Sequence, residues 1–282
     1  MIESSPAILW LLEQAVPFFL VAARIAGVFM LAPILSALMI PLRFKALLVT
    51  AFTCAVFPVI VGGGLTLEYV PKDLIDLFPY LVTEAMIGFV IGAIASLPLL
   101  VLEMSGAIAG QQMGLGISRV YNPEADIETD VLGQLLYTMA LGAFVAFNGL
   151  EILIGTVVDT FEKVPLGVFS SRALPLDLFI STLSGGFELA IRVTTPVSGI
   201  ILMIVMIMGV IGKTMPQINI MTVGFTIKIL IGLGALMLAT SAITVATGEH
   251  IQESLKEITA WVQNLDESLL RGYTSDHVEG GM

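Results

Sequence analysis

Few side chains in this sequence could carry out chemistry, and their positions do not bring them together. The two histidines, His250 and His277, lie in the last part of the chain, away from any cysteine. Cys54 lies in an apolar run and is the one cysteine of the sequence. Because a disulfide needs two cysteines, a disulfide within the chain is excluded. The sequence contains no nucleophile elbow, phosphate-binding loop or zinc-ligand spacing. We therefore expect a protein that is not an enzyme and that uses neither a metal nor another cofactor.

A run of alternate acidic residues, Glu124, Asp126, Glu128 and Asp130, comes nearest to a metal site. Calcium loops also alternate carboxylates, but they need a central glycine and a bidentate glutamate at the end, and both are missing here. Thr129 and Asp130 could instead cap the helix that is expected to follow. The pattern favours a solvated loop or a helix cap over a cation site.

Several charged side chains interrupt apolar stretches, where contact with lipid would be costly. Glu188 and Arg192 are four residues apart with the acid first, which is the favourable order for an ion pair on one helix. We expect this pair to be buried in a packed bundle, where the two charges neutralise each other. The other charges in apolar surroundings, which should face protein, a pore or water, are Arg24, Glu84, Glu103, Glu151, Asp159 and Lys228.

The elements that carry these residues belong in an apolar environment. Of the 282 residues, 57% are hydrophobic and 12% are charged, and the mean hydropathy is +0.98. Such values are typical of membrane proteins and very apolar assemblies rather than of soluble domains. The formal net charge is -11, and Lys and Arg form no cluster, which argues against nucleic acid as a partner.

Six long apolar stretches approach or exceed the roughly 20 residues that a helix needs to cross a bilayer. Pro98, the pair Asn148-Gly149 and Pro196 interrupt three of them near the middle, so we expect kinks or helical hairpins there. Lys and Arg are spread almost evenly over the connecting loops, which leaves the orientation in a membrane open. We predict an all-α, membrane-type protein of long kinked helices and helical hairpins. The stretches are 8–32, 42–62, 74–112, 129–162, 176–212 and 219–247.

The segment that follows residue 248 has a different pattern. Between residues 249 and 273, apolar side chains recur at helical spacing among charged ones, which predicts an amphipathic helix that packs on a partner or lies at an interface. Residues 274–282 have the composition of a disordered tail. We therefore divide the chain into a hydrophobic helical domain at 1–248, an amphipathic helix at 249–273 and a tail.

Glycines recur at helical spacing in the third apolar stretch. Gly88, Gly92, Gly106 and Gly110 form the small-xxx-small pattern that lets helices approach backbone to backbone. We expect these four residues to pack closely against other helices.

The sequence "MSGAIAGQQMGLGISRVYNPE", at 104–124, fits this packing pattern only in part. The side chains of Gln111 and Gln112 point about 100° apart on a helix, and both amides need partners in an apolar bundle. The thioether of Met113 can repack as its neighbours change. The residues alone leave two interpretations open: a closely packed helix face, or a mobile, pore-lining segment.

Two longer stretches resemble a known family. They are "GQQMGLGISRVYNPEADIETDVLGQLLYTMALGAFVAFNGLEILIGTVVDTFEKVPLG", from Gly110 to Gly167, and "KTMPQINIMTVGFTIKILIGL", from Lys213 to Leu233. Both are similar to the FliR/SctT family of type III export-gate proteins, and most closely to its flagellar branch. The resemblance extends over nearly the whole chain.

This resemblance implies a non-enzymatic subunit that joins FliP-like and FliQ-like subunits in one helical complex. FlhB-like and FlhA-like export proteins would be neighbours, and unfolded flagellar subunits would pass through the centre. The implied location is the bacterial inner membrane, in the flagellar basal body. Family members look like a FliP-like half, here about 1–212, fused to a FliQ-like half, here about 213–270, and their kinked hairpins are largely lifted above the membrane plane.

The resemblance also implies which residues close the pore. The segment before Asn122-Pro123 would form a plug, and the turn "MPQINIMTVGF" would contact another subunit. The residues assigned to the plug are Gly110, Gln111, Gln112, Met113, Gly114, Leu115, Gly116 and Asn122. The residues assigned to the subunit contact are Met215, Pro216, Gln217 and Asn219.

Two alternatives remain at this point. One is a virulence-type homologue, which would belong to an injectisome instead of a flagellum. The other is a secondary transporter that binds a solute or a proton through broken helices and charges such as Glu103 and Arg192. A transporter would be stable alone or as a small homo-oligomer, whereas a gate subunit would co-purify with FliP-like and FliQ-like chains.

Overall fold

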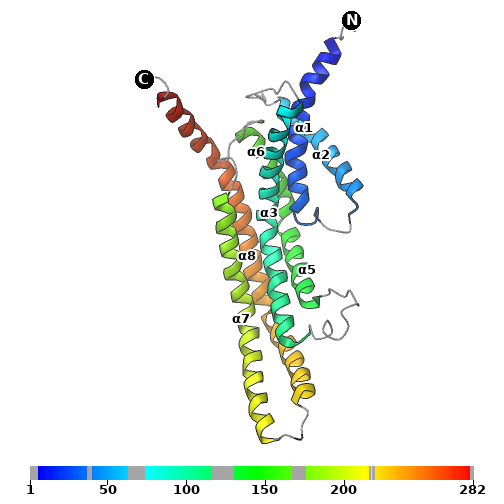
Figure 1. Ribbon diagram of the computed structural model, residues 1–282, viewed down its shortest axis with the longest axis vertical. Coiled ribbons are helices and arrows are strands. Elements are labelled where there is room, and N and C mark those ends of the chain that lie inside the picture. The colour runs from blue at the N-terminus through cyan, green and yellow to red at the C-terminus, as the bar shows by residue number, and fades with distance from the viewer. Residues whose placement is uncertain are drawn as a thin grey trace. The chain divides into compact units, whose positions relative to one another are not determined.

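The protein is all-helical in the part of the chain that the structure, a computed structural model, describes. The described residues are 6–36, 40–62, 74–115, 130–164, 166, 176–215, 217 and 220–279, and none of them forms a β-strand. The helices are α1 (Pro6–Leu31), α2 (Leu42–Gly62), α3 (Leu74–Met113), α5 (Val131–Ala146), α6 (Gly149–Lys163), α7 (Leu176–Thr214) and α8 (Ile220–Glu279) (Figure 1). They match the apolar stretches expected from the sequence, so the predicted fold class is confirmed.

The break expected at Asn148-Gly149 separates α5 from α6. Asn148 adopts a left-handed backbone with φ 55°, a conformation that asparagine tolerates better than most residues. The two helices are bent by 64° relative to each other, and together they pass the length and hydropathy criteria for one broken membrane span. At the other end of α5, the Asp130 carboxylate accepts a hydrogen bond from the Gly133 backbone N–H, so Asp130 is the helix cap.

The two prolines expected to interrupt long stretches do not divide them. Helix α3 continues through Pro98 for 40 residues, and α7 continues through Pro196 for 39 residues. Of the kinks or hairpins expected at these two positions, the hairpins are therefore wrong, and the kinks stay a prediction. Proline removes one hydrogen bond, which a long helix with packed neighbours tolerates.

The amphipathic segment at 249–273 is also not a separate helix. It belongs to α8, which runs without a break for 60 residues to Glu279, and this helix includes most of the tail for which the sequence predicts disorder. The apolar face of the segment, represented by Ile251, Leu255, Ile258 and Val262, is buried in this same chain. The face that the sequence assigned to a partner or an interface is thus covered internally.

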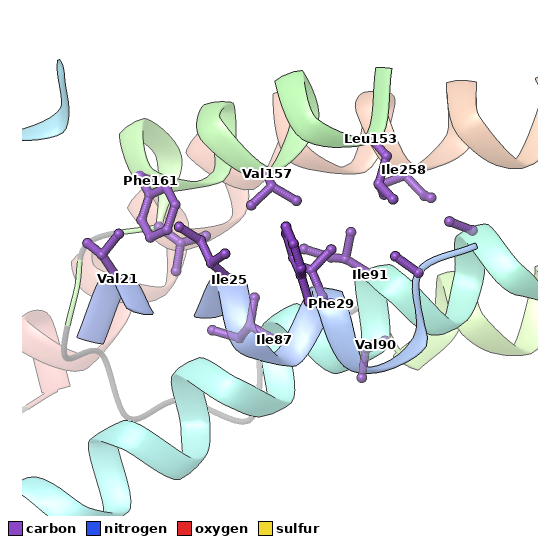
Figure 2. Packing of buried hydrophobic residues seen from close by; sticks show 14 of the residues in the cluster. Val21, Ile25, Phe29, Ile87, Val90, Ile91, Leu153, Val157, Phe161 and Ile258 are labelled. Atoms are coloured by element: carbon purple, nitrogen blue, oxygen red, sulfur yellow. The ribbon is translucent and has the colours of Figure 1, made fainter. Parts of the chain in front are cut away.

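The chain forms two compact units. The first consists of Met1–Ser96, Asn148–Thr182 and Glu253–Met282, and the second of Leu97–Phe147 and Leu183–Gln252. In the first unit, side chains from α1, α3, α6 and the end of α8 point toward one another and form a core (Figure 2). The labelled members of this core are Val21, Ile25, Phe29, Ile87, Val90, Ile91, Leu153, Val157, Phe161 and Ile258.

In the second unit, α7 and α8 form an antiparallel helical hairpin. Near the connecting turn, Gly224 lies against the side chain of Met208, and at the far end Gly185 lies against the ring of His250. The chain reverses after Thr214, between two apolar stretches that the sequence had already separated, and not at Pro196 inside α7.

Four helices are long and apolar enough to cross a membrane, and the bent pair α5 and α6 makes a possible fifth span. The four helices differ sharply in the share of their most apolar stretch that is buried by the rest of the chain. That share is 78% for Leu77–Met113 of α3, but 17% for α2, 22% for α7 and 17% for α8. Helix α3 is thus the internal helix, while the others present apolar surface to lipid or to other proteins.

Candidate functional site: the end of α3 and the packing around it

The end of α3 has a well-defined geometry. The N–H of Leu115 donates to the carbonyl oxygen of Gly110 at 3.0 Å, and the N–H of Gly114 donates to that of Gln111 at 3.0 Å. Gly114 has a φ of 90°, in the left-handed region where side chains are rarely accommodated. These features form a Schellman motif, which ends a helix at a glycine. The regular helix of α3 therefore ends at Met113.

The plug residues assigned from the sequence have unequal surroundings. Gln111, Gln112 and Leu115 are exposed, whereas Gly110 and Met113 are buried. Met113 has an exposed fraction of 0% and is among the largest fully buried side chains of the described chain. The side chains available for contact outside the chain are thus the two glutamines and Leu115. Two further plug residues, Gly116 and Asn122, lie outside the described residues.

The glycines before this end are in close contact with the start of α5. A Cβ added to Gly106 would lie 2.5 Å from the carbonyl oxygen of Leu132 and 2.7 Å from the Cα of Gly133. A Cβ on Gly110 would lie 3.2 Å from Oδ1 of Asp130, and one on Gly133 would lie 2.8 Å from the carbonyl oxygen of Glu103. The backbones of α3 and α5 therefore touch at this end of α3, where glycine allows the close approach.

A similar contact occurs in the other unit, between α3 and α1. A Cβ on Gly88 would overlap the carbonyl oxygen of Arg24, and one on Gly92 would lie 2.7 Å from that of Val28. From the side of α1, a Cβ on Gly27 would overlap the carbonyl oxygen of Ala85. These distances are below normal carbon–oxygen contact, so only glycine fits without moving a backbone.

A buried ionic network stands beside this contact. Nε of Arg24 donates to Oε2 of Glu84 at 2.6 Å, and the two side chains are 0% and 2% exposed. Nη1 of Arg24 donates to the carbonyl oxygen and to Oγ1 of Thr160, at 3.0 and 3.1 Å, and Nη2 donates to the carbonyl oxygen of Val164 at 3.3 Å. The guanidinium also lies 4.5 Å from the centroid of the Phe161 ring. Arg24 thus binds a carboxylate and caps the carboxyl terminus of α6, where a positive charge is favourable.

The pairing of Arg24 with Glu84 was missed by the sequence analysis, which placed both charges in apolar surroundings without joining them. A usable signal exists: Gly27 follows Arg24 by three residues and Gly88 follows Glu84 by four, so each charge has a glycine on its own helix face. Two opposite charges with small neighbours on two apolar helices indicate a close interhelical pair.

The expected pair Glu188–Arg192 forms, but the expectation that it is buried is wrong for this chain. Nη2 of Arg192 donates to Oε1 of Glu188 at 3.0 Å, and the side chains remain 66% and 73% exposed, respectively. The two residues are one helical turn apart on the outward face of α7. The predicted ion pair is therefore present, but both of its side chains are exposed.

The subunit-contact residues lie at the turn between α7 and α8. Met215 and Gln217 are exposed there, and Pro216 and Asn219 lie outside the described residues. The acidic run is also mostly outside them, since of its four members only Asp130 is described, as the cap of α5. Within the described part of the chain, no cluster of three or more His, Cys, Asp or Glu residues could hold a metal ion.

Together, the apolar helices of spanning length, the glycine contacts and the buried ion pair define an α-helical membrane protein whose close packing is built mainly around one internal helix. Over residues 15–254 the chain matches the family described as "Bacterial export proteins, family 1". The match covers most of the chain, and the protein belongs to this family. The family indicated by the sequence motifs is thereby confirmed.

Similar proteins occur in several bacteria. The "Flagellar biosynthetic protein FliR" of Escherichia coli (strain K12) is 26% identical over 246 residues, which is 86% of this chain and 91% of that protein. The protein of the same name from Buchnera aphidicola subsp. Acyrthosiphon pisum is 27% identical over 221 residues, or 77% and 82% of the two chains. That from Aquifex aeolicus is 23% identical over 241 residues, or 86% and 92%.

Proposed function

We propose that this protein is a structural pore subunit of the flagellar type III protein export apparatus, and that it passes unfolded flagellar subunits across the bacterial inner membrane. The observation that carries the proposal is the family match over residues 15–254, together with similar proteins named for flagellar biosynthesis. The flagellar names favour this branch over a virulence-type injectisome.

The distribution of apolar surface supports membership in a larger complex. Helices α2, α7 and α8 bury about a fifth or less of their most apolar stretches within the chain. Some of the exposed surface on α7 is charged, at Glu188 and Arg192, and charges are unfavourable against lipid. Other subunits, of the FliP-like and FliQ-like kind, would cover such a face. FlhB-like and FlhA-like proteins would bind nearby in the basal body.

The proposed plug begins at the end of α3. Gln111, Gln112 and Leu115 provide exposed side chains there, and Gly114 gives the chain an abrupt end to its helix. Soft and glycine-rich walls close a pore against water by close packing, and an arriving unfolded chain replaces those contacts without any cofactor. The energy for export would come from other components of the apparatus.

A secondary transporter receives less support from the geometry. Arg24 and Glu84 are the fully buried charges of the described chain, and they satisfy each other and the end of α6. A proton or solute site needs a charged group that can exchange partners. Arg192, which the transporter hypothesis used, is exposed and paired with its neighbour on the same helix.

The proposal is tested by shortening the plug in the native operon. Deletion of Gly114–Gly116 should allow ions to leak through the assembled complex, while a deletion of Gly280–Met282 of the same size serves as the control. The leak is measured as K⁺ flux from lipid vesicles that contain the complex purified through a tag on this chain. Tight vesicles and normal secretion of flagellar subunits in the shortened variant would count against a plug.

Assembly and substrate class need a second test. A mass measurement on the detergent-solubilised complex should find this chain together with FliP-like and FliQ-like partners, and a homo-oligomer would favour the transporter. Deletion of the gene should abolish motility. Loss of virulence-factor secretion with normal motility would move the protein to the injectisome branch.

A further inference from the structure

Met113, the last residue of α3, is seated on a glycine of α8. A Cβ added to Gly232 would lie 2.8 Å from both Cγ and Cε of Met113 and 2.9 Å from its Sδ. Three side-chain atoms of Met113 thus lie against the bare backbone of Gly232. The two residues belong to the same compact unit, so this contact is part of its internal packing.

The contact is specific to this pair of positions. Gly234 is two residues further along α8, and a Cβ there would have no neighbour within 4 Å. On α3, the residues on either side of Met113 do not share its burial: Gln112 is exposed and Gly114 has no side chain. Met113 is therefore the last side chain by which α3 is held before the chain leaves the helix at the left-handed Gly114.

We propose that Met113 and Gly232 are positioning residues for the gate, because their contact holds the end of α3 on α8 and so sets where the plug begins. This inference rests on the proposed function, and it assigns Met113 a different role from the pore contact that the sequence suggested. Met113 acts on the plug through the backbone of Gly114, while the exposed Gln111, Gln112 and Leu115 remain the candidates for contact with the pore.

The chemistry of the contact suits a gate that opens and closes. A thioether on a glycine makes dispersion contacts without directional hydrogen bonds, and methionine has several rotatable bonds with which to leave and return. A movement of α8 near Gly232 would release the end of α3, and a Cβ at this position requires the Met113 side chain to shift. Helix α8 is in this way coupled to the plug through one pair of residues.

The main experiment compares four variants of the full complex in K⁺-loaded lipid vesicles. Gly232→Ala should displace Met113 and Met113→Ala should leave its space empty, and each should raise the K⁺ leak roughly tenfold, the factor that corresponds to about 1.4 kcal/mol. Gly234→Ala is the matched control and should stay as tight as the wild type. The double variant Met113→Ala/Gly232→Ala places a methyl group in the vacated space and should leak less than either single variant.

The outcomes separate this inference from the proposed function. If the complex with Gly114–Gly116 deleted leaks K⁺ but neither the Gly232→Ala nor the Met113→Ala complex does, the contact between Met113 and Gly232 has no positioning role. The proposal of a plug is then still supported. An equal leak from Gly234→Ala would also overturn the inference, because the effect would not depend on the contact. If the deletion itself does not leak, the plug fails and the inference fails with it.

A disulfide provides a test that does not depend on the assembly of the glycine variants. In a Cys54→Ser background, which removes the one native thiol, Met113→Cys with Gly232→Cys should form a disulfide on oxidation. The locked complex should secrete flagellar subunits at a strongly reduced rate, and a reductant should restore secretion. Absence of the disulfide would contradict the contact, and a disulfide with unchanged secretion would contradict its role in gating.

Discussion

Two arginine–glutamate pairs in this protein have similar chemistry and opposite settings. Arg24 and Glu84 are 60 residues apart in the sequence, come from different helices and are almost completely buried. Glu188 and Arg192 are four residues apart on α7 and remain about two-thirds or more exposed. The buried pair is shorter, at 2.6 Å against 3.0 Å, and Arg24 also binds two carbonyl oxygens and a hydroxyl.

The difference lies in what each pair does for the fold. Removal of one buried charge leaves the other without its opposite charge in a poorly solvated interior, which is strongly unfavourable. Removal of one exposed charge leaves the other in contact with solvent, where the loss is small. We infer that the Arg24 network stabilises the chain itself. The α7 pair has little effect within the chain, and its importance depends on what covers that face in the complex.

The largest effect should come from breaking the buried pair. Arg24→Leu should lower the free energy of unfolding by about 3–5 kcal/mol, because the buried carboxylate of Glu84 loses the opposite charge beside it. Thermal or chemical unfolding of the purified chain in detergent measures this change. The double variant Arg24→Leu/Glu84→Leu should recover part of the loss. A single variant as stable as the wild type would show that the network is not buried in solution.

The next effect should come from the glycine contact that lets the buried pair form. In Gly88→Ala the new Cβ meets the carbonyl oxygen of Arg24, so α1 and α3 must separate, at a cost of about 1–3 kcal/mol. Gly142→Ala on α5 is a suitable control, because a Cβ there meets nothing within 4 Å. The same unfolding measurement should show a loss for the first variant and none for the second. Equal effects would show that helix propensity, and not the contact, is decisive.

A smaller effect should come from one hydrogen bond of the network. Thr160→Val keeps the shape of the side chain but removes the Oγ1 that accepts from Arg24, and it should lower the free energy of unfolding by about 1 kcal/mol. Thr138→Val is the control, since the Thr138 hydroxyl is exposed and bonds only within its own helix turn. A loss at Thr138 as large as that at Thr160 would mean that the arginine contact adds nothing.

The smallest effect on the chain alone should come from the exposed pair. Glu188→Gln should change the free energy of unfolding by about 0.3–0.5 kcal/mol or less, the usual size for an exposed pair one turn apart. The same variant should lower the yield of partner subunits that co-purify with the chain if they cover this face of α7. Unchanged stability together with unchanged yield would place the pair in contact with water.

Local patterns of the sequence predict the helices of this protein well. Apolar runs, Asn148-Gly149 and the cap at Asp130 act within a few residues, and the structure has helices, a bend and a cap at these positions. Proline was a weaker guide, because Pro98 and Pro196 lie inside helices long enough to continue past them. The division into FliP-like and FliQ-like parts near residue 212 stays a prediction.

The contacts between helices could not be predicted in the same way. The four-residue spacing of Gly88, Gly92, Gly106 and Gly110 indicates close packing, but not that the first two lie against α1 and the last two against α5. The contact between Met113 and Gly232 joins residues far apart in the sequence, and neither residue's sequence surroundings predict the other as its neighbour. Periodicity predicts which face of a helix packs closely, whereas the identity of the helix that it packs against depends on the tertiary fold.

The pairing of Arg24 with Glu84 also has a consequence for biosynthesis. Because 60 residues separate the two positions, Glu84 is synthesised roughly 3 to 12 s after Arg24 at 5–20 residues per second. During this interval α1 carries an unpaired arginine, which costs about 2.5–3.5 kcal/mol at the centre of a membrane helix. Helix α1, which is not among the helices found long and apolar enough to cross a membrane, should therefore stay outside the bilayer core until α3 arrives with Glu84.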